Sequence, residues 1–108
     1  MSENSKRWCV YIMTNKKEGV LYIGCTNHII ERVKEHKFIK YPRAFTAKYK
    51  RNLLVYFEEF EDGEEASMRE IQFKKWKRDW KIKLIEDMNP SWMDLSMNWN
   101  LGLNKFRD

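Results

Sequence analysis

The chain has 108 residues, the length of a single domain, and it is 43% hydrophobic and 15% aromatic. So many aromatic residues exclude a disordered chain, and the longest apolar run, Trp8–Met13, is far shorter than the roughly 20 residues that cross a bilayer. The net charge of +5 favours an anionic partner. Because residues 1–7 are polar and carry no signal-peptide segment, we expect a cytoplasmic protein without membrane contact.

A β-hairpin is the first predicted element. Residues Arg7–Thr14 and Val20–Cys25 are rich in aromatic and β-favouring side chains, and residues 15–19 between them are typical of a turn. If Tyr11 and Tyr22 lie directly opposite each other, both phenols leave the same face of the sheet and converge. Ordinary strand packing is the alternative interpretation of this pair.

The two cysteines, Cys9 and Cys25, are too few for a disulfide scaffold and lack the spacing of a metal site, so we expect reduced thiols. In the same register they lie on opposite faces of the hairpin. Gly24, near the end of the second strand, permits a close backbone approach or a positive φ angle.

A helix is predicted from an N-cap at Asn27 to about Phe38. Arg32 and His36 lie four residues apart at the border of its apolar seam, which consists of Ile29, Ile30 and Val33. An arginine at this place can hold a phosphate, and a nearby histidine can move a proton. The alternative is an ordinary pair of surface residues.

The next predicted strand, Leu53–Phe57, is apolar on both faces, which indicates that it is covered on both sides. Asp62 and Glu65 have the spacing of a capping box, and the long helical segment that follows is broken near Asn89-Pro90. Two apolar flanks along this segment mean that it is either buried on two sides or bent near Trp80.

The rest of the chain is predicted to contain a helical turn at Ser91–Leu95 and a tail without periodicity. We therefore expect one domain over residues 1–95 and a C-terminal tail over residues 96–108, where Trp99 and Phe106 either cover the sheet or mediate self-association. The element order is β-β-α-β-α, which predicts an α+β domain with a short mixed sheet and helices packed against it.

Glu70 is the most informative single residue of the chain. At 100° per residue it lies on the apolar stripe between Ala66 and Phe73, whereas the other acids of this region cluster before it or point elsewhere. A carboxylate that faces inward needs a cation or hydrogen-bond donors around it. A salt bridge to a lysine or an arginine is the structural alternative.

Basic residues gather in two clusters, each of which is either a solvated face or an anion-binding surface. The first cluster comprises Lys34, Lys37, Lys40, Arg43, Lys48, Lys50 and Arg51, and the second comprises Lys74, Lys75, Lys77, Arg78, Lys81 and Lys83.

Five short pieces occur in a fixed order along the chain: Val10-Tyr11-Ile12, Tyr22-Ile23-Gly24, Arg32 with His36, Arg69-Glu70, and Asn89-Pro90. As an ordered set over residues 7–95 they resemble the GIY-YIG nuclease superfamily, and in detail its small stand-alone members related to the UvrC N-terminal nuclease domain. Cys9 and Val10 stand where the first motif of the family has glycine and isoleucine.

The resemblance implies a three-stranded antiparallel sheet flanked by helices, with a Mg²⁺- or Mn²⁺-dependent site on one face. It also implies roles for six polar residues: Glu70 as the metal ligand, Arg32 on the scissile phosphate, Tyr11 or Tyr22 as the general base, His36 as an assisting group, and Asn89 as a group that orders the site. A single glutamate suffices for Mg²⁺, because this cation keeps several of its waters.

We therefore expect a metal-dependent endonuclease that hydrolyses DNA phosphodiester bonds, with structured or damaged DNA favoured over a fixed sequence. The basic clusters would contact the DNA backbone. One alternative is a basic nucleic-acid-binding module without hydrolysis, and another is a protein-interaction domain. Glu70 argues against the binding module, since it places negative charge beside a phosphate unless a cation intervenes. The choice between the two tyrosines, the DNA target and the oligomeric state stay open.

Overall fold

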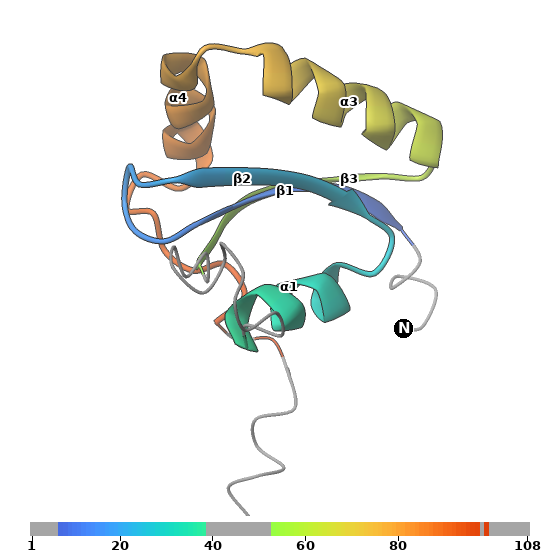
Figure 1. The fold of residues 1–108 in the computed structure, drawn as a ribbon, viewed down its shortest axis with the longest axis horizontal. Coiled ribbons are helices and arrows are strands. Elements are labelled where there is room, and N and C mark those ends of the chain that lie inside the picture. Colours follow the sequence, from blue (N-terminus) through green and yellow to red (C-terminus); the bar gives the residue numbers. More distant parts are fainter. Residues whose placement is uncertain (1–6, 39–52, 98, 100–108) are drawn as a thin grey trace, which may run out of the picture.

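The computed structural model describes residues 7–38, 53–97 and 99. In chain order its elements are β1 (Trp8–Thr14), β2 (Leu21–Thr26), α1 (Ile29–Phe38), β3 (Leu53–Phe60), α3 (Gly63–Lys75) and α4 (Arg78–Met88). Figure 1 shows the sheet between two helical layers, with α1 on one face and α3 and α4 on the other. The predicted α+β class is confirmed.

The sheet has the strand order β2-β1-β3, and both pairs of strands are antiparallel. The expectation of a mixed sheet is therefore wrong, and the antiparallel sheet implied by the resemblance is confirmed. Every residue of β1 from Cys9 to Thr14 is buried, as suits a central strand with a helical layer on each face. Opposite the step from Ile12 to Met13 the register of β3 shifts at Val55, which marks a β-bulge.

The hairpin register differs by two residues from direct pairing of the tyrosines. Tyr11 lies opposite Gly24, and Tyr22 lies opposite Met13. Because residues two apart in a strand share a face, both tyrosines still leave the same face of the sheet. The cysteines fall on opposite faces and are both free thiols, as predicted.

Each face of the sheet has its own core. On the side of α1 the buried residues are Tyr11, Met13, Val33 and Leu54. On the side of α3 and α4 they are Val10, Ile12, Ile23, Val55, Tyr56, Ala66, Phe73, Ile85 and Trp92. Burial on both faces of the sheet agrees with the apolar pattern of β3, although this strand extends to Phe60 and not only to Phe57.

The long helical segment is two helices, so the order is β-β-α-β-α-α. Asp62 caps α3 as predicted, with its side chain accepting a hydrogen bond from the Glu64 backbone N–H at 2.9 Å. The break comes at Trp76 and Lys77, which both have extended backbone, and not at Trp80. Turning the chain there lets Phe73 and Ile85, on different flanks of the segment, both reach the sheet core.

Two smaller expectations about helix ends are corrected. The first helix begins at Ile29, and Thr26 Oγ1, before Asn27, accepts a hydrogen bond from the His28 N–H at 2.9 Å. The predicted helical turn at Ser91–Leu95 is absent: residues 90, 91 and 95–97 form turns, residues 92–94 are irregular, and Trp92 has a positive φ of 55°.

Asp94 joins three parts of the structure. Its carboxylate accepts a hydrogen bond from Lys37 Nζ of α1 at 2.5 Å, from the Leu54 N–H of β3 at 3.3 Å, and from the Ser96 N–H and Oγ at 3.0 and 2.7 Å. Ser96 is buried, and the Trp99 ring lies 5.8 Å from that of Phe57. Trp99, 11 residues after the end of α4, therefore still packs against the sheet.

Asp94→Asn is expected to lower stability in a pH-dependent way. Burial raises the pKa of Asp94, but the hydrogen bonds from Lys37 and Ser96 outweigh it and hold the pKa below its usual value. A carboxyl with a lowered pKa stabilises the folded state above the unfolded pKa of about 4, and this contribution is lost as the pH falls through the folded pKa. Urea unfolding should show a loss of about 2 kcal/mol at pH 7 that shrinks in acid. An equal loss at both pH values would contradict this account; exposed Asp79→Asn is the control.

Candidate active site

Three rings from three different elements meet beside α1. Tyr11 of β1 and Tyr22 of β2 have ring centroids 6.2 Å apart, and His36 of α1 lies 6.0 Å from the first ring and 4.9 Å from the second. The Tyr11 hydroxyl lies 3.5 Å from His36 Nε2, at the outer limit of a hydrogen bond. The structure therefore brings together three of the predicted site residues.

Gly24 allows the Tyr11 ring to cross the edge strand. A Cβ atom at this position would lie 2.4 Å from the Tyr11 hydroxyl oxygen and 2.5 Å from its Cζ. Since Gly24 is directly opposite Tyr11 and β2 is an edge strand, the phenol extends over β2 toward the outer side of the sheet. Any side chain at Gly24 would collide with a ring that is buried and cannot swing away.

Charges from two helices act on this phenol. The positive charge of Arg32 on α1 lowers the pKa of Tyr11, and the negative charge of Glu70 on α3 raises it. Glu70 also acts on Cys25, whose side chain is on the α3 face of β2. Arg32 and Glu70 are thus on helices that cover opposite faces of the sheet.

The two tyrosines differ in their environment. Tyr11 is 1% exposed, and burial raises its pKa far above the usual value; the neighbouring Tyr22 adds to the rise and Arg32 opposes it. Tyr11 is thus a neutral phenol that can donate a hydrogen bond at ordinary pH. Tyr22 is half-buried and retains contact with solvent. Arg32 is also accessible, with 48% of its side chain exposed and Nη1 3.7 Å from Glu35 Oε1.

Glu70 combines the predicted inward direction with a salt bridge. Its side chain is 22% exposed, and Oε2 lies 2.9 Å from Nζ of Lys74, four residues later on α3. Within the described residues there is no group of three or more His, Cys, Asp or Glu side chains that could hold a metal ion. A site with a full set of protein ligands therefore does not fit these residues, whereas a hard cation that keeps its waters and needs one carboxylate does fit Glu70.

Asn89 does not join the cluster. This buried side chain donates through Nδ2 to the Val55 and Met93 carbonyls at 3.0 and 2.9 Å, and its Oδ1 accepts from the Met93 N–H at 3.0 Å. Val55 belongs to β3, the edge strand opposite to β2. The hydrogen bonds of Asn89 tie the segment after α4 to the sheet, which supports a role in positioning and not in contact with a substrate.

The structure describes one basic cluster in part and the other in full. In the first, Lys34 lies 3.9 Å from Glu31 and Lys37 is bound to Asp94, whereas Lys40, Arg43, Lys48, Lys50 and Arg51 fall outside the described residues. The second cluster lies at the end of α3 and on α4. Its Arg78 Nη2 donates to the carbonyls of Glu18 and Gly19 at 2.6 and 2.7 Å, and this fixes α4 to the hairpin turn.

An ion pair between α3 and β3 was not predicted from the sequence. Arg69 donates through Nε and Nη2 to the two oxygens of Glu58 at 2.9 and 3.0 Å, and Tyr56 donates to the same carboxylate. The guanidinium also lies 4.5 Å from the Phe73 ring centroid. Burial raises the pKa of Glu58, but the hydrogen bonds from Arg69 and Tyr56 outweigh it and lower the pKa overall. This forked pair fixes the rotation of α3, on which Glu70 is the next residue.

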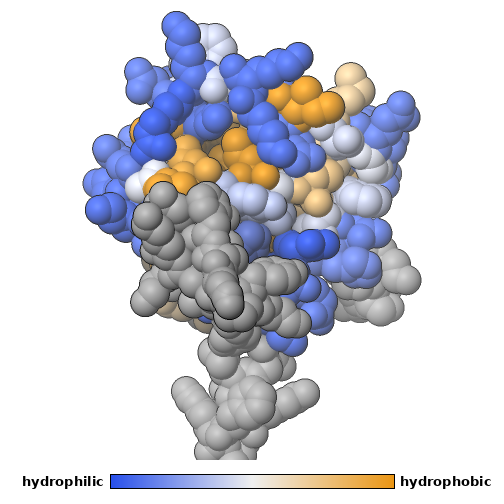
Figure 2. Space-filling view, viewed as in Figure 1, coloured by the Kyte–Doolittle hydropathy of each residue, from blue (hydrophilic) through white to orange (hydrophobic). Residues whose placement is uncertain are grey.

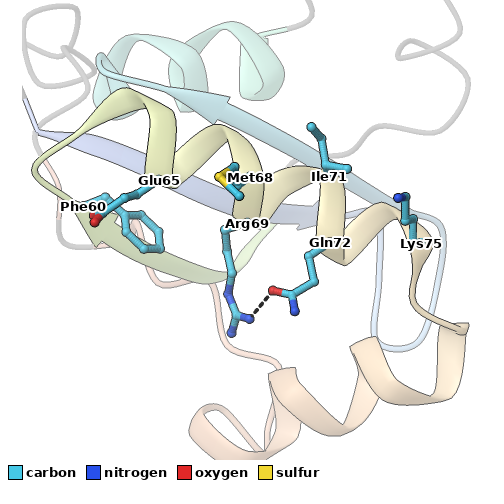
Figure 3. Close-up of a pocket in the computed structure, with 7 residues that line it drawn as sticks. All are labelled: Phe60, Glu65, Met68, Arg69, Ile71, Gln72 and Lys75. Carbon is cyan, nitrogen blue, oxygen red and sulfur yellow. Dashed lines mark hydrogen bonds between the residues drawn. The ribbon is translucent and has the colours of Figure 1, made fainter.

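A shallow groove of about 650 Å³ runs along α3, apart from the ring cluster (Figure 3). Arg69 Nη1 donates to Gln72 Oε1 there at 2.7 Å. The groove is lined by Phe60, Glu65, Met68, Arg69, Ile71, Gln72 and Lys75. Because it includes neither tyrosine nor Glu70, it is not part of the candidate active site.

Comparison with known proteins gives the family of this chain. The family described as the GIY-YIG catalytic domain matches residues 7–83. The chain therefore belongs to the GIY-YIG family, and membership implies nuclease activity in general, with DNA as the substrate. GIY-YIG nucleases are generally metal-dependent.

The similar proteins are small bacterial chains named UPF0213 proteins, and this name states no activity. One from Clostridium perfringens is 42% identical over 80 residues, which cover 70% of this chain and 80% of the relative. One from Desulfotalea psychrophila is 37% identical over 63% of this chain and 61% of its own length, and one from Staphylococcus haemolyticus is 35% identical over 72% and 93%. No solved structure matches the chain. Among the described residues, no helix has the length and apolar character needed to span a membrane.

Gly24→Ala is expected to destabilise the fold because of the Tyr11 ring. Forcing a methyl group into this contact should cost about 1–3 kcal/mol in urea unfolding. In a Tyr11→Leu background the same change should cost clearly less, since the ring that it meets is gone. The double-mutant cycle should therefore show a strong coupling between the two positions. Additive effects would mean that Gly24 is required by its own backbone and not by the phenol.

Proposed function

We propose that this chain is a metal-dependent endonuclease that hydrolyses DNA phosphodiester bonds, with Tyr11, Tyr22, Arg32, His36 and Glu70 as its catalytic residues. The observation that carries the proposal is the meeting of the three rings of Tyr11, Tyr22 and His36, with the charges of Arg32 and Glu70 acting on the Tyr11 phenol. These groups come from four elements, of which β1, β2 and α1 follow one another in the chain and α3 comes later, and a fold needs no such set of polar groups for stability alone.

Glu70 would hold the metal ion, Mg²⁺ or Mn²⁺, through one carboxylate. When bound, such a cation polarises a phosphate oxygen and lowers the pKa of a bound water. Arg32 supplies a planar, permanently charged fork for the phosphate, and its exposed side chain can approach a ligand at the surface. Gly24 is a structural member of the site, because it lets the Tyr11 phenol reach it.

The two tyrosines would have different roles: Tyr11 as a hydrogen-bond donor and Tyr22 as the phenol that contacts water. Tyr11 is buried with a raised pKa, so it remains protonated and donates a hydrogen bond that orients the site. Tyr22 is the phenol with solvent contact and lies against His36 at 4.9 Å, so it is the one placed to contact the attacking water. Asn89 acts from a distance by holding the last segment on β3.

The substrate we propose is structured or damaged DNA, with basic side chains on its backbone. Backbone contacts of this kind give affinity that depends on salt and hardly on sequence. A non-catalytic DNA-binding module is the second candidate, and the Lys74–Glu70 salt bridge favours it, because an engaged carboxylate is not open to a cation. The two candidates predict different effects of a Glu70 substitution on DNA cleavage.

Glu70→Gln is expected to lower the nicking of supercoiled plasmid by at least about 100-fold in Mg²⁺ or Mn²⁺, because it removes the charge that stabilises the reacting centre. DNA affinity in a chelating buffer should largely survive. Glu65→Gln is the matched control, since this exposed carboxylate is on the same helix and away from the rings. Lys74→Met, which releases Glu70 from its partner, should retain nicking.

Equal nicking by wild type and Glu70→Gln, or nicking that persists in chelator, would overturn the proposed site. Tight binding without any nicking by the wild type across nicked, branched and duplex substrates would favour the binding module.

A further inference from the structure

The bend between α3 and α4 carries a dense positive charge. Residues 74–83 hold six Lys and Arg residues and one acid, Asp79. All six basic side chains are exposed or half-buried. Figure 2 shows that the helical layer above the sheet is largely hydrophilic, with smaller hydrophobic areas between the polar side chains.

Trp80, whose indole is exposed, lies among these basic residues in the sequence. Trp80 is 57% exposed, although most tryptophans of a soluble domain bury most of their surface. Lys83 is three residues after it on α4, and positions three apart lie on the same side of a helix. Lys77 is the N-cap residue that directly precedes α4. Both lysines are exposed, and Lys83 makes a long, solvent-exposed ion pair with Asp87 at 3.7 Å. Their charge is therefore accessible to an anion from solvent.

Neighbouring aromatic rings support the Trp80 indole. Its ring lies 5.8 Å from that of Trp76 in an edge-to-face arrangement, and Trp76 in turn lies 5.2 Å from the buried Phe73 ring. Arg78, next to Lys77, is fixed to the hairpin turn by its two hydrogen bonds. Trp80 is therefore a supported aromatic surface and not a loosely attached side chain.

This surface continues to the candidate active site. Lys74, the first basic residue of the cluster, is the residue that binds Glu70. A strand of nucleic acid with one phosphate at Glu70 and Arg32 could thus follow the lysines toward Trp80. A second copy of this chain is a poor occupant, because two such positive surfaces repel each other.

We propose that Trp80 and the lysines beside it form a platform for unpaired DNA, in which a base stacks on the indole and the flanking phosphates lie against Lys77, Lys81 and Lys83. A base can stack on an aromatic ring only when it is not already paired and stacked within a duplex. This platform therefore selects single-stranded segments over duplex. The inference rests on the proposed function and narrows its substrate to DNA with an unpaired stretch beside the cleavage point.

The test measures binding without cleavage. Fluorescence anisotropy in EDTA compares a labelled single-stranded oligonucleotide of about 15 nucleotides, near the upper site size of one such domain, with the duplex of the same sequence. The protein is the full chain with Glu70→Gln. Adding Trp80→Ala should weaken single-strand binding about tenfold and change duplex binding less than about twofold. Trp80→Phe should retain most of the affinity, because it keeps an aromatic face.

Two further variants separate stacking from charge. Met88→Ala, an exposed apolar residue of the same helix, is the matched control and should bind as its parent. Lys77→Ala with Lys81→Ala should reduce the slope of log affinity against log salt by about 0.7 for each phosphate that the protein no longer neutralises, whereas Trp80→Ala should leave the slope unchanged.

Unaltered single-strand affinity in Trp80→Ala, equal weakening for single strand and duplex, or a preference of the wild-type platform for RNA over DNA would each overturn the proposal. Thermal unfolding of each variant ensures that the compared proteins are folded. Since no step of this experiment requires cleavage, its result is independent of whether Glu70→Gln abolishes nicking.

Discussion

The contact between Gly24 and the Tyr11 ring is the constraint on which the candidate site depends. Tyr11 is on the central strand, so its hydroxyl can reach the rim of the sheet only by crossing the edge strand, and the missing side chain at Gly24 opens that path. The two-residue offset of the hairpin places this glycine directly opposite the phenol. Gly24 is therefore required both for the packing of the hairpin and for the position of the Tyr11 hydroxyl.

Charged side chains from both helical layers act on the Tyr11 phenol. Arg32 comes from α1 on one face of the sheet and Glu70 from α3 on the other. In the function we propose, Arg32 would bind the phosphate and Glu70 would hold the metal ion. The Glu58–Arg69 pair keeps α3 from rotating, which preserves the direction of Glu70.

Much of the fold and of the candidate site could be predicted from the sequence, and the remainder depends on tertiary contacts. The strands, the Asp62 cap and the inward direction of Glu70 follow from local periodicity and turn chemistry. The hairpin register does not, because a turn of this length permits more than one pairing. The bend at Trp76 results from the need of two apolar flanks to reach one sheet. The Glu58–Arg69 pair joins residues 11 apart on different elements, so no local spacing reveals it.

The most direct test of the account is where a paramagnetic ion settles on the protein. With substoichiometric Mn²⁺, NMR signals of Gly24, Tyr22 and Glu70 should broaden first, while those of Asn89 and its partner Val55, at the β3 edge of the sheet, stay sharp. Glu70→Gln should abolish the selective broadening. Uniform broadening over the surface, or a pattern that Glu70→Gln leaves unchanged, would contradict a metal site at the β2 edge.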